Sequence, residues 1–98
     1  MYKITTIHTR PDITTPFYRR DAEVAAISTD AKLNGQLLSE ESVLSEDKLT
    51  VTYIAVWDSF ASFDTFSKVE AVAAFRVAKS EHNRTNNIIQ FANKQEAI

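Results

Sequence analysis

Residues 49–57, with the sequence LTVTYIAVW, restrict the possible folds of this chain more than any other stretch. Their β-branched and aromatic side chains favour a β-strand. Successive side chains of a strand point to opposite faces, so Val51, Tyr53 and Trp57 share one face. Ile54 and Val56 point to the other, which makes both faces apolar toward the end of the strand. A single layer of helices covers only one face of a sheet, so the other face needs a separate cover.

The first half of the chain predicts a strand, a helix and a second strand. Residues 2–10 alternate in polarity like a strand, and a proline ends them. Thr15 is suited to cap a helix over residues 16–29. Gly35 is the only glycine, which indicates positive φ or a close backbone approach, at the end of this helix or at a kink in the strand expected over residues 36–44. The polar middle of the second strand indicates an edge position in the sheet.

The second half predicts a hairpin, an interrupted helix and a last strand. The polar residues 45–48 form a turn that pairs the second and third strands. Residues 59–80 have apolar side chains at helical spacing, with a break near residues 67–68. Residues 81–86 are expected to form a loop and residues 87–92 a short strand. The polar tail beyond that strand either frays or lies on a partner.

The predicted order is strand, helix, strand, strand, helix, strand, which is the ferredoxin-like arrangement of the α+β class. We expect residues 1–98 to form a single domain, with a four-stranded antiparallel sheet and helices on one face. A second copy of the sheet is the simplest cover for the remaining apolar face. The sequence therefore predicts a sheet-to-sheet homodimer with an interface above about 1,000 Å².

Charge and hydropathy exclude several kinds of partner. The 11 basic and 13 acidic residues give a net charge of −2, spread along the chain. Nucleic acid is not an expected partner, because phosphate binding needs a clustered basic face. No window approaches the roughly 18 consecutive apolar residues of a membrane span, and residues 1–6 alternate in polarity, which is not the pattern expected of a signal peptide. We therefore expect a cytoplasmic protein that does not bind a membrane.

The chain has few residues of the types that bind metals or act together as a catalytic acid and base. There is no cysteine, and the two histidines, His8 and His82, are separated by most of the chain. A metal site needs several converging ligands, so no metal site is predicted. Glu40 and Glu41 are neighbours on a strand and point to opposite faces, which excludes a paired-carboxylate acid and base.

The run VTYIAVWDS at residues 51–59, followed by Phe60, Phe63 and Phe66, resembles the dimeric α+β barrel superfamily. The resemblance is to its antibiotic-biosynthesis-monooxygenase-like members. It implies a homodimer with a pocket between each sheet and its own helices. Members of the superfamily include cofactor-independent monooxygenases, haem-degrading enzymes, isomerases and proteins of no known activity, so the resemblance does not select one function.

The same resemblance argues against haem. The haem-degrading members have an asparagine in the first strand, a tryptophan in the second helix and a haem-ligating histidine beyond that tryptophan. The matching positions here hold Thr6 or a neighbour, Phe66 and Phe75, and none of them agrees. Without a histidine at Phe75 the helix supplies no proximal ligand, so we expect no haem and no other cofactor.

His8 and Tyr53 are the candidate catalytic residues. Imidazole titrates near neutral pH, so His8 is suited to act as a general base, although such a histidine often only makes a hydrogen bond in a sheet. The aromatic residues are suited to line an apolar pocket whose polar end is held by Tyr53, His8 or Arg20, although core packing is the more common role for any one of them. The residues predicted to contact a ligand are His8, Phe17, Arg20, Tyr53, Trp57, Phe63, Phe66 and Phe75.

Three hypotheses about function follow. In the first, a small homodimer binds an apolar or amphipathic molecule, such as an aromatic or long-chain carboxylate, without converting it. In the second, the protein is a cofactor-independent monooxygenase or isomerase acting on a phenolic or quinone-like substrate. In the third, the chain is a dimerisation module with a filled core and no pocket.

Overall fold

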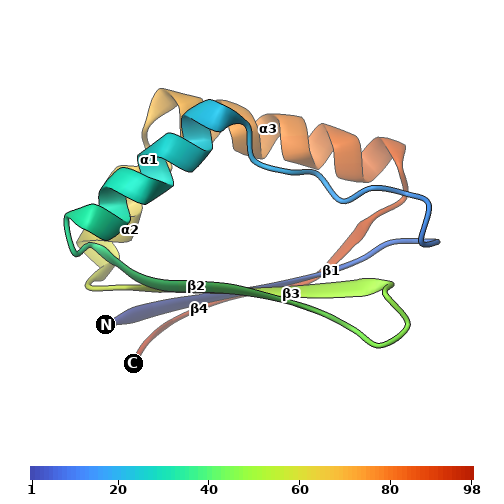
Figure 1. The fold of residues 1–98 in the computed structure, drawn as a ribbon, viewed down its shortest axis with the longest axis horizontal. Helices are drawn as coiled ribbons and strands as arrows, with labels where there is room; N and C mark the ends of the chain where they lie inside the picture. The colour runs from blue at the N-terminus through green and yellow to red at the C-terminus, as the bar shows by residue number, and fades with distance from the viewer.

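The chain folds into one four-stranded sheet with three helices over one of its faces (Figure 1). The computed structural model describes residues 1–98. The elements in chain order are β1 (Tyr2–Thr9), α1 (Ala22–Leu33), β2 (Leu37–Leu44), β3 (Thr50–Trp57), α2 (Phe60–Ser67), α3 (Glu70–Thr85) and β4 (Ile89–Ala97). None of the helices has the length and apolar character needed to cross a membrane.

The sheet has the strand order β2-β3-β1-β4, and each neighbouring pair is antiparallel. This is the ferredoxin-like order that the sequence predicts. The stretch at residues 49–57 supplies the central strand β3, and β2 lies at an edge, as its polar middle indicates. The prediction of an α+β fold with helices on one face is therefore confirmed.

The core lies between the helices and the inner face of the sheet. Ile4 on β1 pairs with Ala55 on β3, and both are at most 7% exposed. Trp57 extends the same row and packs against Phe66, with ring centroids 4.9 Å apart. Helix α1 adds Ala31 to this cluster. Burial of these apolar side chains is the main force that holds the helices on the sheet.

The opposite face of the sheet carries no helix (Figure 1). Ile7, Ile54 and Val56 point to this face and remain partly exposed. At the two edges of the sheet, Val43 is 53% exposed and Ile89 is 64% exposed. The open face of the sheet, defined here by these five residues, therefore has the apolar character that the sequence predicts.

The expectation that the first helix begins at Pro16 with a Thr15 cap was wrong. Helix α1 begins at Ala22, and the carboxylate of Asp21 accepts a hydrogen bond from the amide of Val24. Thr15 instead donates its hydroxyl to the carboxylate of Asp12, in a turn that precedes the helix. The segment between β1 and α1 is consequently extended and runs beside α3.

Gly35 has the positive φ predicted for it, +73°. It follows Asn34, the C-cap residue of α1, and the amide of Gly35 donates to the carbonyl of Lys32. The amide of Gln36 then donates to the carbonyl of Ala31 at 3.0 Å. This left-handed turn closes the helix and leads directly into β2.

The predicted break near residues 67–68 is confirmed, because α2 ends at Ser67 and α3 begins at Glu70. The expected loop over residues 81–86 was wrong, since α3 continues to Thr85. The polar side chains of its last turn make hydrogen bonds that the local residue pattern does not reveal. His82 contacts the carbonyl of Pro16 at 2.8 Å, and the side-chain amide of Asn86 donates to the carbonyl of His82.

The last strand is longer than predicted and starts two residues later. β4 covers Ile89–Ala97, and the expected free tail is paired with β1, with Ala97 opposite Tyr2. Beyond the strand, the amide of Ile98 donates to the carbonyl of Met1. Polar side chains are common on an edge strand, whose outer side faces solvent, and this explains why their pattern did not indicate a strand.

The position of the helix cap is directly testable. We expect Asp21→Ala to lower the free energy of unfolding by about 1 kcal/mol, because it removes the side-chain acceptor at the helix start. Thr15→Ala is the matched control and should cost less than half of this. Urea unfolding followed by circular dichroism measures both. Equal losses, or a larger loss for Thr15→Ala, would contradict the assigned cap.

Candidate functional site

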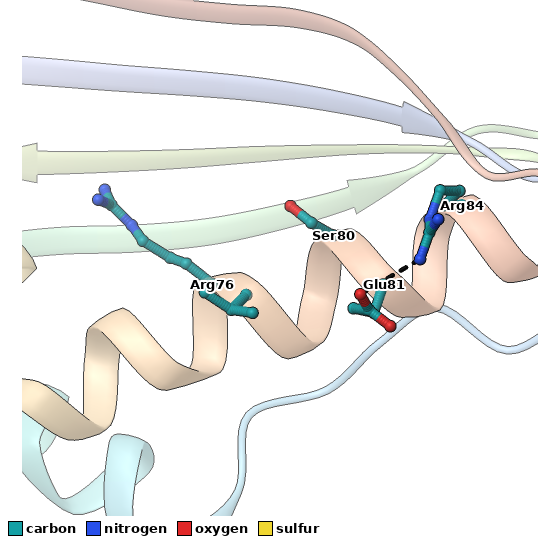
Figure 2. A pocket seen from close by; sticks show the side chains of 5 residues that line it. Arg76, Ser80, Glu81 and Arg84 are labelled. Carbon is teal, nitrogen blue, oxygen red and sulfur yellow. Dashed lines mark hydrogen bonds and ion pairs between the residues drawn. The ribbon is translucent and has the colours of Figure 1, made fainter.

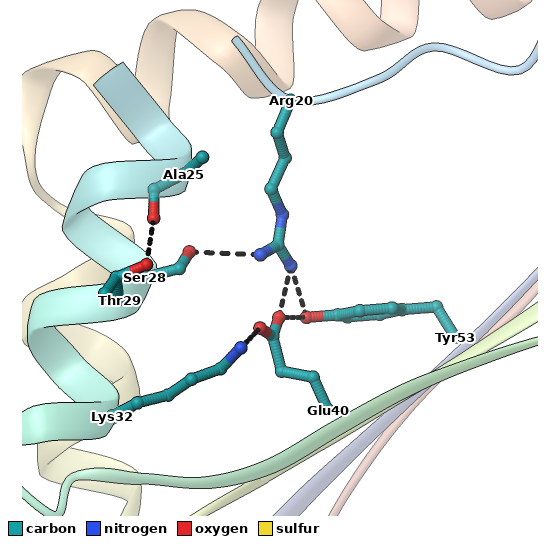
Figure 3. Close-up of polar contacts among 7 residues, drawn as sticks. All are labelled: Arg20, Ala25, Ser28, Thr29, Lys32, Glu40 and Tyr53. Atoms are coloured by element: carbon teal, nitrogen blue, oxygen red, sulfur yellow. Dashed lines mark hydrogen bonds and ion pairs between the residues drawn. The ribbon is translucent and has the colours of Figure 1, made fainter. Parts of the chain in front are cut away.

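A polar cluster joins the helical layer to the sheet, and Glu40 lies at its centre (Figure 3). Arg20, in the segment before α1, places its Nη2 atom 2.5 Å from Oε2 of Glu40 and 2.5 Å from the hydroxyl of Tyr53. Tyr53 also donates its hydroxyl to Glu40. Lys32 of α1 lies 2.7 Å from Oε1, and Arg20 donates to the hydroxyl of Ser28 at 3.1 Å.

Glu40 points toward the helices because β2 contains a bulge. Leu37 pairs with Trp57, whereas Glu40 pairs with Ala55. Between these two pairs β2 advances by three residues and β3 by only two. The extra residue, Leu38, shifts the alternation and brings Glu40 to the same face as Leu37. The carboxylate therefore reaches a buried position, with its side chain 11% exposed, instead of pointing to solvent.

The cluster keeps Glu40 ionised. Burial alone would raise its pKa, but hydrogen bonds from Arg20, Lys32 and Tyr53 outweigh burial and lower the pKa to about 2. Burial and the bond to Glu40 raise the pKa of the Tyr53 hydroxyl above its ordinary value. Tyr53 is thus a neutral donor at physiological pH, and its proton is already committed to Glu40.

His8 lies on the inner face of β1, where it is 4% exposed. Its Nε2 atom is buried and has no hydrogen-bond partner. Burial lowers the pKa of His8, the nearby charge of Lys79 lowers it further, and the side chain of Gln90 acts in the opposite direction. The lowered pKa favours the neutral imidazole, and Nε2 is left as a buried polar atom without a hydrogen-bond partner.

Lys79 of α3 belongs to the same region, and the sequence analysis missed it. It is half-buried, and burial lowers its pKa together with the charges of Arg20 and Arg76. The available signal was its spacing, since Val72, Phe75 and Lys79 follow the helical period of the buried stripe. A lysine in that stripe is unusual and marks a place where a charge enters the interior.

The aromatic residues predicted to contact a ligand divide into three groups. Trp57, Phe63 and Phe66 pack together in the core, beside Ile4. Phe75 packs against Tyr18 with ring centroids 5.4 Å apart, close to His82. Phe17 lies under the guanidinium of Arg10. Tyr53 packs against the same core as the first group, and its hydroxyl belongs to the Glu40 cluster, with its ring beneath the guanidinium of Arg20.

A separate shallow hollow of about 380 Å³ lies along α3 (Figure 2). Its lining residues are Arg76, Val77, Ser80, Glu81 and Arg84. Four of the five are polar, and Arg84 pairs with Glu81 within the lining. None of the predicted site residues lines this hollow, so it is distinct from the region around His8 and Glu40.

The sequence matches no protein-family model and no curated protein. Solved structures with the same fold are found at low sequence identity. A protein from Mycobacterium tuberculosis, Rv0793, is 13% identical with a TM-score of 0.61, covering 100% of this chain and 95% of the other. SnoaB, a cofactor-independent oxygenase from Streptomyces nogalater, is 11% identical with a TM-score of 0.60, covering 99% and 91%.

An antibiotic biosynthesis monooxygenase is 12% identical with a TM-score of 0.57, and the match covers 100% of this chain and 99% of the other. At this identity the likeness concerns the fold alone. The chain therefore has the same ferredoxin-like fold as these solved structures, as its sequence indicates.

Acid unfolding tests the Glu40 cluster. The pKa of Glu40 is about 2 in the folded protein and 4.5 ordinarily, so its stabilisation is complete above about pH 4.5 and is lost as the pH falls toward 2. The difference corresponds to as much as about 3 kcal/mol. We expect Glu40→Gln to destabilise the protein at pH 7 and to flatten the dependence of stability on pH between 4.5 and 2.

Glu41→Gln is the matched control, because Glu41 is exposed and pairs opposite Ile54 on the other face of the sheet. Urea unfolding at a series of pH values measures both variants. An acid dependence in Glu40→Gln equal to that of the unmodified chain would refute the assigned role of this carboxylate.

Proposed function

We propose that the protein binds a small amphipathic molecule between the sheet and the helices, with His8 contacting its polar end. The observation that carries this proposal is the buried Nε2 atom of His8, which has no partner. Buried polar atoms in folded proteins nearly always have one, because leaving one unsatisfied costs about 1–3 kcal/mol. A ligand atom at this nitrogen would supply the missing bond.

The Glu40 cluster defines which residues are free to contact the ligand. Arg20 and Tyr53 direct their polar atoms to Glu40, so we assign them to the wall of the site. Phe75 lies on the inward face of α3, one turn before Lys79, and is suited to contact the apolar part of the molecule. Trp57, Phe63 and Phe66 pack in the core between the helices and the sheet, and we assign them a supporting role.

We also propose that the protein acts as a homodimer whose subunits meet through the open face of the sheet. Ile54 and Val56 lie at the middle of this face, on the central strand β3, and Ile7 lies beside them on β1. A second copy of the chain offers the same apolar surface, so this face can be covered without a different protein. The interface would bury side chains that are partly exposed in the single chain.

A second candidate function is cofactor-independent oxygenation of a phenolic substrate. The lowered pKa of His8 favours it, because a neutral imidazole with a free nitrogen can accept the proton of a phenol. SnoaB, which has this fold, is a cofactor-independent oxygenase. Oxygen uptake with 1,5-dihydroxynaphthalene tests this candidate: uptake that is lost in His8→Leu supports it, and uptake equal to that of buffer rejects it.

The effect of His8 on the free energy of unfolding distinguishes a ligand-binding role from a structural one. We expect His8→Leu to raise the free energy of unfolding by about 1 kcal/mol, because an apolar side chain removes the unsatisfied nitrogen. The same variant should lose most of its affinity for N-phenyl-1-naphthylamine, a neutral fluorescent probe. Urea unfolding and probe fluorescence measure the two effects.

His82→Leu is the matched control, since the ring of His82 contacts the carbonyl of Pro16. We expect this variant to be less stable and to retain probe binding. If His8→Leu destabilises the protein and binds the probe unchanged, His8 serves the fold and the proposed function is wrong.

The proposed dimer is testable by sedimentation velocity at micromolar concentration. Ile54→Lys places a charge at the middle of the open face and should convert the dimer to a folded monomer. Val77→Lys is the control, because Val77 is 66% exposed on α3, away from the sheet. A monomeric unmodified chain, or a dimer that survives Ile54→Lys, would show that the subunits do not meet through this face.

A further inference from the structure

We infer that the two copies of the dimer pack with their strands aligned, so that Glu41 of each copy forms an ion pair with Lys94 of the partner subunit. This inference rests on the proposed homodimer and specifies how its subunits are oriented. It is carried by the strand registers and by the charges at the two edges of the open face of the sheet.

Glu41 and Lys94 lie in one row of residues across the open face. Glu41 on β2 pairs with Ile54 on β3, and Ile54 pairs with Thr5 on β1. Thr5 pairs in turn with Lys94 on β4. Residues that are directly opposed in an antiparallel sheet point to the same face. The row therefore has a carboxylate at one edge of the sheet and an ammonium at the other.

The two charges cannot meet within one chain. Two strands separate β2 from β4, which places these edge strands about 14 Å apart. Glu41 takes part in none of the five ion pairs of the chain. Lys94 pairs only with Glu96, at 3.6 Å, and its side chain remains 68% exposed. Both charges are thus accessible to a second chain.

The charges on the open face divide into a negative half and a positive half. Glu41 is the only charged residue that β2 and β3 direct to this face. On β1 and β4, Lys3 and Lys94 outnumber the single carboxylate of Glu96. One half therefore carries an excess negative charge and the other an excess positive charge. Such a face is complementary to a second copy only when opposite halves meet.

A two-fold axis parallel to the strands brings opposite halves together. Sheets that pack face to face have their strands either aligned within about 30° or crossed near 90°. An axis between β3 and β1 lays β2 of one copy over β4 of the other and each row over its own image. Glu41 then faces Lys94 of the partner subunit, and the symmetry produces this ion pair twice. A crossing of about 30° moves the edge residues by about 4 Å, which these long side chains span.

An axis perpendicular to the strands lays β2 over β2 of the partner subunit. The residues that β2 directs to the open face are Ser39, Glu41 and Val43, so Glu41 meets no cation in this orientation. Covering a carboxylate without a partner is costly. The charges therefore favour the axis that is parallel to the strands.

The neighbouring row fits the same orientation. Val43 lies in one row with Thr52, Ile7 and Ala92. With the axis parallel to the strands, Val43 faces Ala92 of the partner subunit, and Ile7 faces Thr52 of the partner subunit. Val43 is 53% exposed in the single chain and is covered by an apolar residue in this dimer. The orientation that pairs the charges thus also covers apolar surface.

The ion pairs lie at the rim of the interface. Because Glu41 has no ion pair within its own chain, the pairs act on the orientation and affinity of the subunits and not on the fold of one chain. Reversing one of these charges is therefore expected to change assembly and to leave the circular dichroism spectrum unchanged.

A charge-reversal cycle measured by sedimentation equilibrium tests the inference. Glu41→Lys or Lys94→Glu alone replaces two attractions in the dimer by two repulsions, so each should weaken the dimer at least about tenfold. The double variant restores both attractions and should bind within about threefold of the unmodified chain. Because the two positions are at opposite edges of the sheet, this recovery can arise only between copies.

Mixing the two single variants gives a second, independent readout. A dimer of one Glu41→Lys chain and one Lys94→Glu chain has two attractive pairs, so the mixture should associate as tightly as the unmodified protein. Glu46→Lys is the matched control, since it makes the same charge change at an exposed residue of the turn between β2 and β3. It should leave the dissociation constant unchanged.

The outcomes separate this inference from the proposed dimer. A double variant that associates no more tightly than the single variants would overturn the inference, and the proposed dimer stands if Ile54→Lys still dissociates the unmodified protein. Tighter association of Glu41→Lys with the unmodified chain than with Lys94→Glu would indicate β2 over β2, which also overturns the inference. A monomeric unmodified chain would contradict both.

Discussion

The ionised carboxylate of Glu40 joins the two layers of this protein. It receives Arg20 from the segment before α1, Lys32 from the end of α1 and Tyr53 from the central strand (Figure 3). Three parts of the chain that are distant in sequence are thereby fixed to one point. The same contacts occupy Arg20 and Tyr53, so Nε2 of His8 is left as a buried polar atom without a protein partner. The arrangement of the candidate site therefore depends on this single interaction.

The sequence predicted the fold well, because hydrophobic alternation is a strong signal in central strands. The run from Val51 to Trp57 is apolar on both faces, and it lies at the centre of the sheet with helices on one side only. The positive φ of Gly35 and the edge position of β2 followed from equally local rules. What local rules missed are polar residues whose partners are distant. His82 extends α3 through a contact with Pro16, and the polar end of β4 is ordered by pairing with β1.

The candidate site was predicted less completely, for two physical reasons. Glu40 faces inward only because of the bulge at Leu38, and a bulge in β2 leaves no clear mark in the residue pattern. Lys79 has the spacing of the buried stripe of α3, but a lysine at such a position usually extends to solvent, so spacing alone did not single it out. His8 was singled out because imidazole titrates near neutral pH, and its alternation with Ile4 on β1 places it on the buried face. Its missing partner became visible only in three dimensions.

The proposed function places the polar end of a small amphipathic ligand at Nε2 of His8. Nitrogen-15 NMR of the histidine rings tests it most directly, because His82 provides an internal reference in the same molecule. We expect saturating N-phenyl-1-naphthylamine to shift the Nε2 resonance of His8 and to leave that of His82 in place. An unchanged His8 resonance at saturation, or equal shifts in both histidines, would contradict the account.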